Sequence, residues 1–150
     1  MTGREICDNH SESLAMLFRG CFTEQATYQE ILPDGYVSGD VLMVETVRLE
    51  PQYRGYGIGL LAMDRLVKRV EQASPEWGDE GLLVLSPSGL MSDMVSSGNH
   101  AVVQEKLIRY WETFGLSVLV RETVMHSTFV GHWMGYERPR IETVVPNLLQ

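Results

Sequence analysis

The sequence has 150 residues, a length typical of one compact domain, and 44% of them are hydrophobic while 21% are charged. This balance excludes a disordered or fibrous chain. Twenty acidic residues outnumber 12 basic ones, and the net charge of -8 argues against nucleic acid or an anionic membrane as a partner. We therefore expect one globular domain over residues 1–150.

The compartment is indicated by what the chain lacks. No run approaches the roughly 20 apolar residues of a membrane span, and the first residues do not follow the basic and then apolar pattern of a signal peptide. Cys7 and Cys21 form no C-x-x-C pair and have no His or Cys at zinc-ligand spacing, so we interpret both as reduced thiols and expect no metal site. These features predict a cytoplasmic protein.

The first third of the chain is acidic and weakly patterned. Apolar residues on one side of 13–22 predict a short helix, and Pro33 with Asp34-Gly35 predicts a loop after it. We find no clear pair of strands before residue 41. The front of the sheet is therefore expected to be short, with an exposed edge that favours pairing into a homodimer.

The middle of the chain carries a strand, a glycine turn and a helix. Residues 41–49 are rich in aliphatic and β-branched side chains and predict a strand, which Pro51 closes. Apolar residues recur at helical spacing from Ile58 to Val70, and the helix should end before Ser74-Pro75 because a proline disfavours helix at the residue before it.

The remaining elements follow in alternation. The apolar run 82–86 predicts a buried strand, and the spacing of apolar residues over 100–114 predicts a helix with Gly115 as a left-handed C-cap. Residues 116–120 and 127–136 predict two further strands. The resulting class is α/β in the mixed α+β sense.

The glycine turn 52–60 is the local feature that points to chemistry. A helix N-terminus offers unpaired N–H groups and partial positive charge, and glycines let phosphate oxygens approach the backbone. A dinucleotide fingerprint fails because Leu60 or Ala62 stands at its third glycine and no acidic ribose partner follows at the right distance. A P-loop fails because no Lys-Ser or Lys-Thr follows the glycines.

The arrangement that fits is a strand, a proline, and then Q/R-x-x-G-x-G/A opening a helix. The segment 49–61 resembles motif A of the GNAT superfamily of acetyl-CoA-dependent N-acetyltransferases, in two overlapping frames that start at Gln52 and Arg54. The second strand and a helix ending Tyr-Trp-Glu-Thr-Phe-Gly-Leu are similar to the family's motif B. The resemblance covers about residues 41–120.

The resemblance implies a twisted, mostly antiparallel sheet with helices on both faces, in which the parallel strands 41–49 and 82–86 splay to admit the pantetheine arm of acetyl-CoA. It also implies a bulge near residues 47–49, which would aim the Leu49 amide at the thioester carbonyl, where an oxyanion develops. The cofactor contacts that it implies are Val47, Leu49, Gln52, Arg54, Gly55, Tyr56, Gly57, Ile58, Gly59, Leu60, Gln104 and Trp111.

The catalytic residues are less plain. Glu45 stands in the predicted strand where related enzymes often carry a carboxylate, and we expect it to deprotonate the substrate amine; an outward-facing residue paired with Arg48 is the alternative. Trp111 occupies the position of the family's tyrosine acid, and an indole cannot donate that proton. Tyr110 is the candidate replacement, although it points roughly 100° away on the helix and packing is the competing role for both aromatics.

The function that we expect is direct transfer of the acetyl group from acetyl-CoA to an amine acceptor, with proximity supplying most of the acceleration. A catalytically silent domain that binds CoA or a protein partner is one alternative, and transfer to a hydroxyl is another. The acceptor is not predicted, because the segments that would build its pocket, 1–40 and 121–150, resemble the family least.

Overall fold

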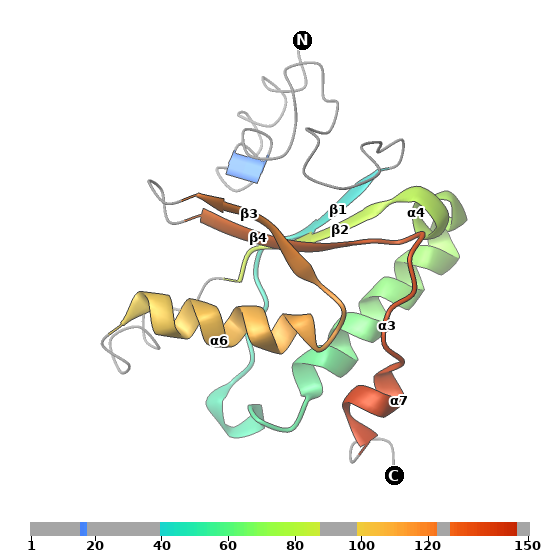
Figure 1. Cartoon of the computed structure of the whole chain (residues 1–150). Coiled ribbons are helices and arrows are strands. Elements are labelled where there is room, and N and C mark those ends of the chain that lie inside the picture. Colours follow the sequence, from blue (N-terminus) through green and yellow to red (C-terminus); the bar gives the residue numbers. More distant parts are fainter. Residues whose placement is uncertain (1–15, 18–39, 88–98, 123–126, 147–150) are drawn as a thin grey trace.

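The computed structural model describes residues 16–17, 40–87, 99–122 and 127–146, which are coloured in Figure 1. They form a mixed α+β domain in which four strands make one sheet. The strands are β1 (Val41–Val44), β2 (Leu82–Leu85), β3 (Ser117–Glu122) and β4 (Ser127–Trp133). The predicted fold class is confirmed at this level.

The sheet has the strand order β1-β2-β4-β3. β1 and β2 are parallel, with Val41 opposite Leu82 and Val44 opposite Leu85. β4 is antiparallel to both β2 and β3. The described sheet is therefore mostly antiparallel with one parallel pair, as the sequence predicts.

The predicted strand 41–49 is wrong at its carboxyl end. β1 stops at Val44, and the four residues after it are exposed. Its partner β2 stops at Leu85 and is followed two residues later by Pro87. Because β2 ends at Leu85, opposite Val44, residues 45–49 have no strand beside them to pair with among the described residues, and the parallel ladder ends there.

Two long helices cover one side of the sheet. α3 (Ile58–Ala73) ends before Ser74-Pro75, as predicted, and α6 (His100–Glu112) is followed by Gly115 at φ +98°, which confirms the left-handed turn there. The predicted helix 100–114 is two residues longer than the helix itself. None of the described helices combines the length and apolar composition needed to cross a membrane.

Three short elements were not predicted. They are the 3₁₀ helix η1 (Pro51–Tyr53), α4 (Pro75–Glu80) and α7 (Ile141–Val144). Of the predicted helix 13–22, Met16 and Leu17 are helical and the rest lies outside the described residues, as do both cysteines and the loop at 32–36.

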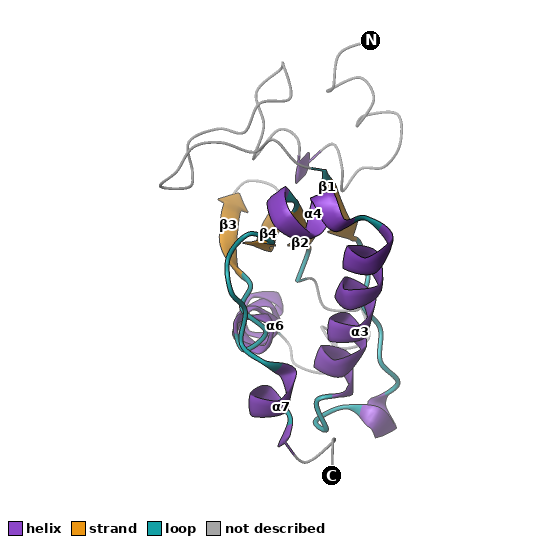
Figure 2. Ribbon diagram, turned by 90° about the vertical axis from the view of Figure 1, so that its right-hand side faces the viewer, coloured by secondary structure: helices purple, strands orange, loops and turns teal. Residues whose placement is uncertain are grey.

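The two faces of the sheet are packed differently. Alternate residues of β1 and β2 face α3, α6 and α7 in the larger core, and Figure 2 shows α3 and α6 on the same side of the strands. Leu82 and Val84 face the opposite way, toward Leu119, Phe129 and Leu17. α3 and α6 are thus fixed by the same apolar face, which brings the beginning of α3 within reach of α6.

Candidate functional site

The site begins where the parallel pair opens. After Val44 the chain leaves the sheet and runs to η1 and α3, while β2 ends at Leu85, which is paired with Val44 (Figure 1). In sheets with parallel strands, ligands bind beyond the carboxyl ends of the strands. The carboxyl ends of β1 and β2 are therefore the first part of the candidate site.

The turn before α3 has a fixed shape. The Arg54 Nε donates a hydrogen bond to the Leu49 carbonyl at 2.8 Å, and the backbone N–H of Tyr53 donates to the Glu50 carbonyl at 2.9 Å. Gly55 and Gly57 have φ values of +84° and +78°. Side chains with a Cβ are disfavoured in this region, so the turn requires these two glycines.

The turn leaves a row of backbone donors without partners. Gly57 is the N-cap of α3, and no side chain caps this helix. The N–H groups from Gly55 to Gly59 make no hydrogen bond with any residue that the structure describes. A helix N-terminus that presents free N–H groups attracts anions.

Tyr110 contributes the one side-chain group bonded to this helix start. Its hydroxyl oxygen accepts a hydrogen bond from the Leu60 N–H at 3.1 Å. The approach depends on Gly59, because a Cβ there would lie 2.6 Å from the tyrosine oxygen. The hydroxyl keeps its own proton available for donation to a bound group.

Burial raises the pKa of Tyr110, and the hydrogen bond from the Leu60 N–H partly opposes this shift. A tyrosine whose pKa is raised stays protonated throughout the neutral range. Tyr110 therefore presents a protonated hydroxyl at the start of α3, beside its packing contact with Trp111.

Trp111 occupies a different place from the one that the resemblance implies. Its side chain is only 4% exposed and belongs to the larger core, where it meets the edge of the Tyr110 ring at a centroid distance of 5.0 Å. Gln104 lies seven residues before Trp111, close to two helical turns, and is partly buried on that side of α6. Trp111, for which the resemblance implies a cofactor contact, thus lies in the core.

The residues after β1 are placed outside the sheet. The expected bulge near 47–49 is absent because those residues are unpaired, and the Leu49 carbonyl is engaged by Arg54. Val47 is 40% exposed. Glu45 is exposed one residue beyond the last pair of the parallel ladder and forms no ion pair with any described residue, whereas Arg48 Nη2 lies 3.9 Å from Glu50 Oε1.

The late strand region contains two histidines, His126 and His132. His126 lies outside the described residues, while His132 lies on β4 with Nδ1 3.2 Å from the Gly115 carbonyl and Nε2 2.9 Å from the Tyr136 carbonyl. Burial lowers the pKa of His132, Arg138 adds to the shift, and the two carbonyls oppose it. His132 joins the turn after α6 to the end of β4.

Sequence reasoning missed the contact between Tyr110 and Leu60. A signal for it was present: Gly59 stands inside the first turn of a helix, and a glycine there costs stability unless something approaches closely. The hydroxyl that approaches comes from a residue fifty positions later.

No family model, curated protein or solved structure matches this chain. The functional argument therefore depends on the geometry and chemistry of the site.

Proposed function

We propose that this protein is an acetyl-CoA-dependent N-acetyltransferase of the GNAT type. One observation carries the proposal: among the described residues the backbone N–H groups from Gly55 to Gly59 have no hydrogen-bond partner, and the half-buried Tyr110 hydroxyl lies beside them on the Leu60 N–H. Phosphate binding, proton donation and space for an extended arm are the three requirements of the reaction, and the free N–H groups with the Tyr110 hydroxyl support the first two.

In this proposal the pyrophosphate of acetyl-CoA lies on the N–H groups of residues 55–59. Two charges of the ligand would meet the positive end of α3, which has no acidic residue in its first turn. Gln52 and Tyr56 flank the turn as exposed side chains, and the arm of the cofactor would follow the chain from the turn toward Val44. Val44 and Leu85 mark the point where the strands part.

The chemistry is a direct acyl transfer. The acceptor nitrogen attacks the thioester carbonyl, the carbon–sulfur bond breaks, and the departing thiolate takes a proton from Tyr110. Glu45 removes one proton of the acceptor ammonium before the attack, and the second proton, which the nitrogen loses as the intermediate collapses, returns through water to the Tyr110 oxygen, so that Tyr110 is neutral again. A positioned acid or base contributes about 10²–10⁴-fold to such a reaction.

The first experiment asks whether the turn binds CoA. Saturation at about 100 times Kd stabilises a protein by about 2.7 kcal/mol, so acetyl-CoA should raise the melting temperature by roughly 5–10 °C. Gly57→Asp should abolish the shift, since it adds a side chain at positive φ and a negative charge at the phosphates. Asn99→Asp is the matched control, because it adds the same charge at the start of α6.

A melting temperature that is unchanged by millimolar CoA, with no heat in calorimetry, would refute the proposal. Retained CoA affinity in Gly57→Asp would show that the ligand binds elsewhere.

The second experiment tests the base. A panel of amines is screened for thiol release from acetyl-CoA, and Glu45→Gln should then lower turnover about 10²–10⁴-fold at neutral pH, with a smaller loss at high pH where the amine is already deprotonated. Glu50→Gln is the control, since it removes a nearby exposed carboxylate. Full activity of Glu45→Gln would assign the proton to another group.

A silent CoA-binding domain is the second candidate. It is favoured by one observation, the burial of Trp111 at the position where the resemblance expects the acid. Tight CoA binding without thiol release to any amine of the panel would select it.

A further inference from the structure

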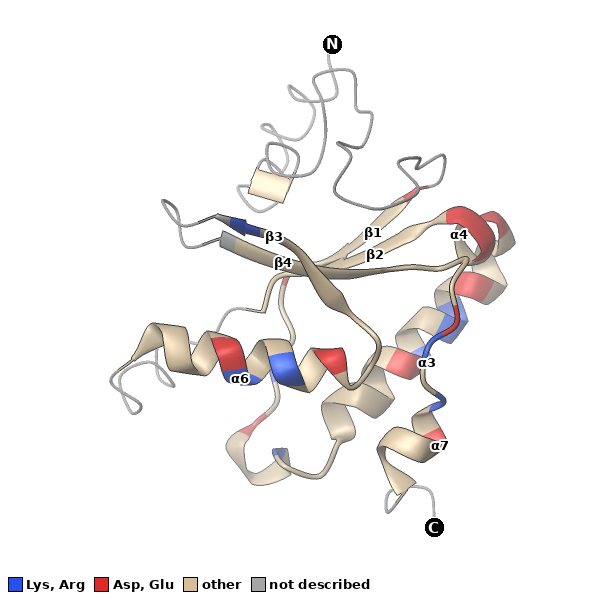
Figure 3. Cartoon of the chain, viewed as in Figure 1, with Lys and Arg blue, Asp and Glu red and all other residues tan. Residues whose placement is uncertain are grey.

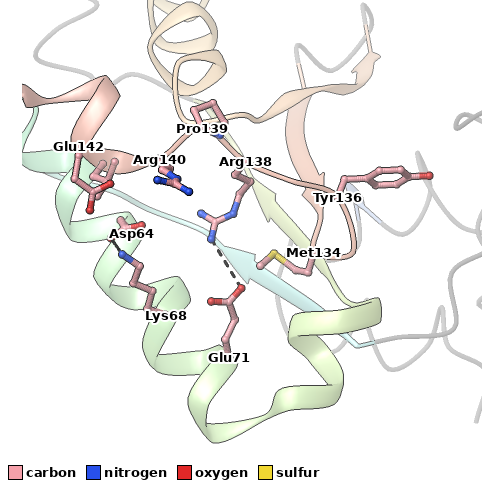
Figure 4. A pocket seen from close by; sticks show the side chains of 10 residues that line it. Asp64, Lys68, Glu71, Met134, Tyr136, Arg138, Pro139, Arg140 and Glu142 are labelled. Carbon is pink, nitrogen blue, oxygen red and sulfur yellow. Dashed lines mark ion pairs between the residues drawn. The ribbon is translucent and has the colours of Figure 1, made fainter.

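A hollow in the surface lies well away from the glycine turn. It has a volume of about 290 Å³, is open to solvent, and lies between the middle of α3 and the segment 134–142 (Figure 4). Its α3 residues run from Asp64 to Glu71, which are roughly 9 to 20 Å along the helix from Ile58 at about 1.5 Å per residue. The hollow is therefore separate from the proposed cofactor site.

The lining is charged but balanced. Acidic and basic residues lie along both α3 and the segment beside it, as Figure 3 shows. The cations are Lys68, Arg138 and Arg140, and the anions are Asp64, Glu71 and Glu142. A hollow with equal numbers of both charges favours neither a simple anion nor a simple cation.

Two ion pairs within the protein join four of these six charged residues. Lys68 Nζ lies 2.8 Å from Asp64 Oδ2, and Arg138 Nη2 lies 3.9 Å from Glu71 Oε1. The Arg138 guanidinium also lies over the ring of Phe114 at 5.0 Å from its centroid. These four charged groups therefore already have partners within the protein, and they line the sides of the hollow.

The two remaining charged residues of the lining are Arg140 and Glu142. Neither the Arg140 guanidinium nor the Glu142 carboxylate has a hydrogen bond or ion pair with another residue in the described part of the chain. Figure 4 shows both side chains at the same end of the hollow, above α3. One positive and one negative group are thus left facing the same space.

The backbone that carries these two residues is well anchored. Thr143 donates to the Arg140 carbonyl from both its N–H, at 3.0 Å, and its hydroxyl, at 2.7 Å. Ile141, between the two charged residues, is 5% exposed in the core. Met134, which also lines the hollow, is 7% exposed, so these two side chains supply apolar surface beside the charges.

We propose that this hollow binds a free α-amino acid with an apolar side chain. Its carboxylate would pair with Arg140, a guanidinium suited to bidentate binding, and its ammonium would pair with Glu142. Its side chain would contact Met134 and Ile141. The volume, at the small end of the roughly 300–1,000 Å³ of ligand pockets, suits a molecule of this size.

Calorimetry on the full chain tests the proposal with L-leucine and L-methionine as probes. Isovalerate and 3-methylbutylamine share the apolar group of leucine but carry only one charge each. We expect each to bind about 10- to 100-fold more weakly than leucine, because each leaves one charged group of the protein without a partner. Isovalerate binding as tightly as leucine would replace the proposal with a simple anion site.

Variants assign the binding to this hollow. Arg140→Gln and Glu142→Gln should each weaken leucine binding at least about 10-fold. Arg109→Gln and Glu112→Gln remove exposed charges of α6 and should leave it unchanged; thermal melts verify that all four variants are folded. Absence of binding by both amino acids at 10 mM, or unchanged affinity in both hollow variants, would overturn the proposal. Neither outcome depends on CoA, so the proposed function stands or falls separately.

Discussion

The two long helices begin in opposite ways. α6 starts at Asn99, whose side-chain oxygen accepts a hydrogen bond from the Ala101 N–H at 3.0 Å. α3 starts at Gly57 in the left-handed conformation, and no side chain caps it. The first arrangement satisfies a donor of the helix locally, while the second leaves donors exposed.

The difference teaches how to separate structural from functional helix ends. An N-cap of the Asn type contributes about 1 kcal/mol, so an uncapped start forgoes stability that a single side chain would supply. At α3 the one donor with a side-chain partner, the Leu60 N–H, is bonded by Tyr110 from α6. The capped helix thus provides the group that completes the uncapped one.

The largest effect is expected from Tyr110→Phe. Loss of the hydroxyl removes the proposed proton donor, so turnover of the best amine should fall about 10²–10⁴-fold while CoA affinity changes by only a few-fold, since the donors at 55–59 remain. Steady-state kinetics and calorimetry measure the two quantities.

Tyr56→Phe is the control for this change, because its side chain is 64% exposed on the turn itself. Full turnover in Tyr110→Phe would assign its hydroxyl to holding α3 against α6 and remove it from the mechanism.

Removing the cap of α6 should change the stability of the protein and leave its ligand binding unchanged. Asn99→Ala is expected to lower the free energy of unfolding by about 1 kcal/mol and the melting temperature by roughly 2–4 °C. CoA affinity should stay unchanged. A loss of CoA affinity as complete as that of Gly57→Asp would mean that both helix starts serve the ligand.

The smallest effect concerns His132 and pH. Burial lowers the folded-state pKa of His132 below its unfolded value of about 6.5, so the unfolded chain binds more protons as the pH falls through this range. The stabilising contribution of neutral His132 is therefore present at pH 7.5 and lost toward pH 5.

His132→Gln removes this titration. The melting temperature of the native protein should fall more on acidification from pH 7.5 to 5 than that of the variant, by less than the roughly 2–4 °C that 1 kcal/mol produces in a protein of this size. Parallel pH profiles of the two proteins would show that His132 has the same pKa in both states.

The features that could be predicted from the sequence are those that depend on residues close together in the chain. The extent of α3 follows from its apolar spacing and from Ser74-Pro75, and the turn after α6 follows from Gly115. The run 82–86 needed only its own composition to be placed as a strand, which ends one residue earlier at Leu85. The shape of the glycine turn likewise depends on residues within the turn itself.

The features that it missed depend on a neighbour. The end of β1 coincides with the end of its partner strand β2 at Leu85, and no property of residues 45–49 discloses it. The roles of Tyr110 and Trp111 depend on how α6 is rotated against α3, since adjacent helical residues differ by about 100° in direction. Periodicity identifies the faces of a helix, whereas docking decides which face meets the site.

β3 contains an irregularity with a consequence for how this chain tolerates insertions and deletions. Val118 pairs with Val130 and Val120 with Phe129, so Leu119 is an extra residue in the ladder. Leu119 and Val120 consequently contribute to the same core, and Arg121 emerges on the α6 side, where it forms an ion pair with Glu105. Deleting Leu119 would restore the regular two-residue alternation of β3 and keep Val120 opposite Phe129 and Arg121 opposite Thr128. The bulge is therefore a position where β3 can lose one residue without exchanging its two faces, at the cost of the Leu119 side chain in the core, whereas losing a regularly paired residue would exchange them.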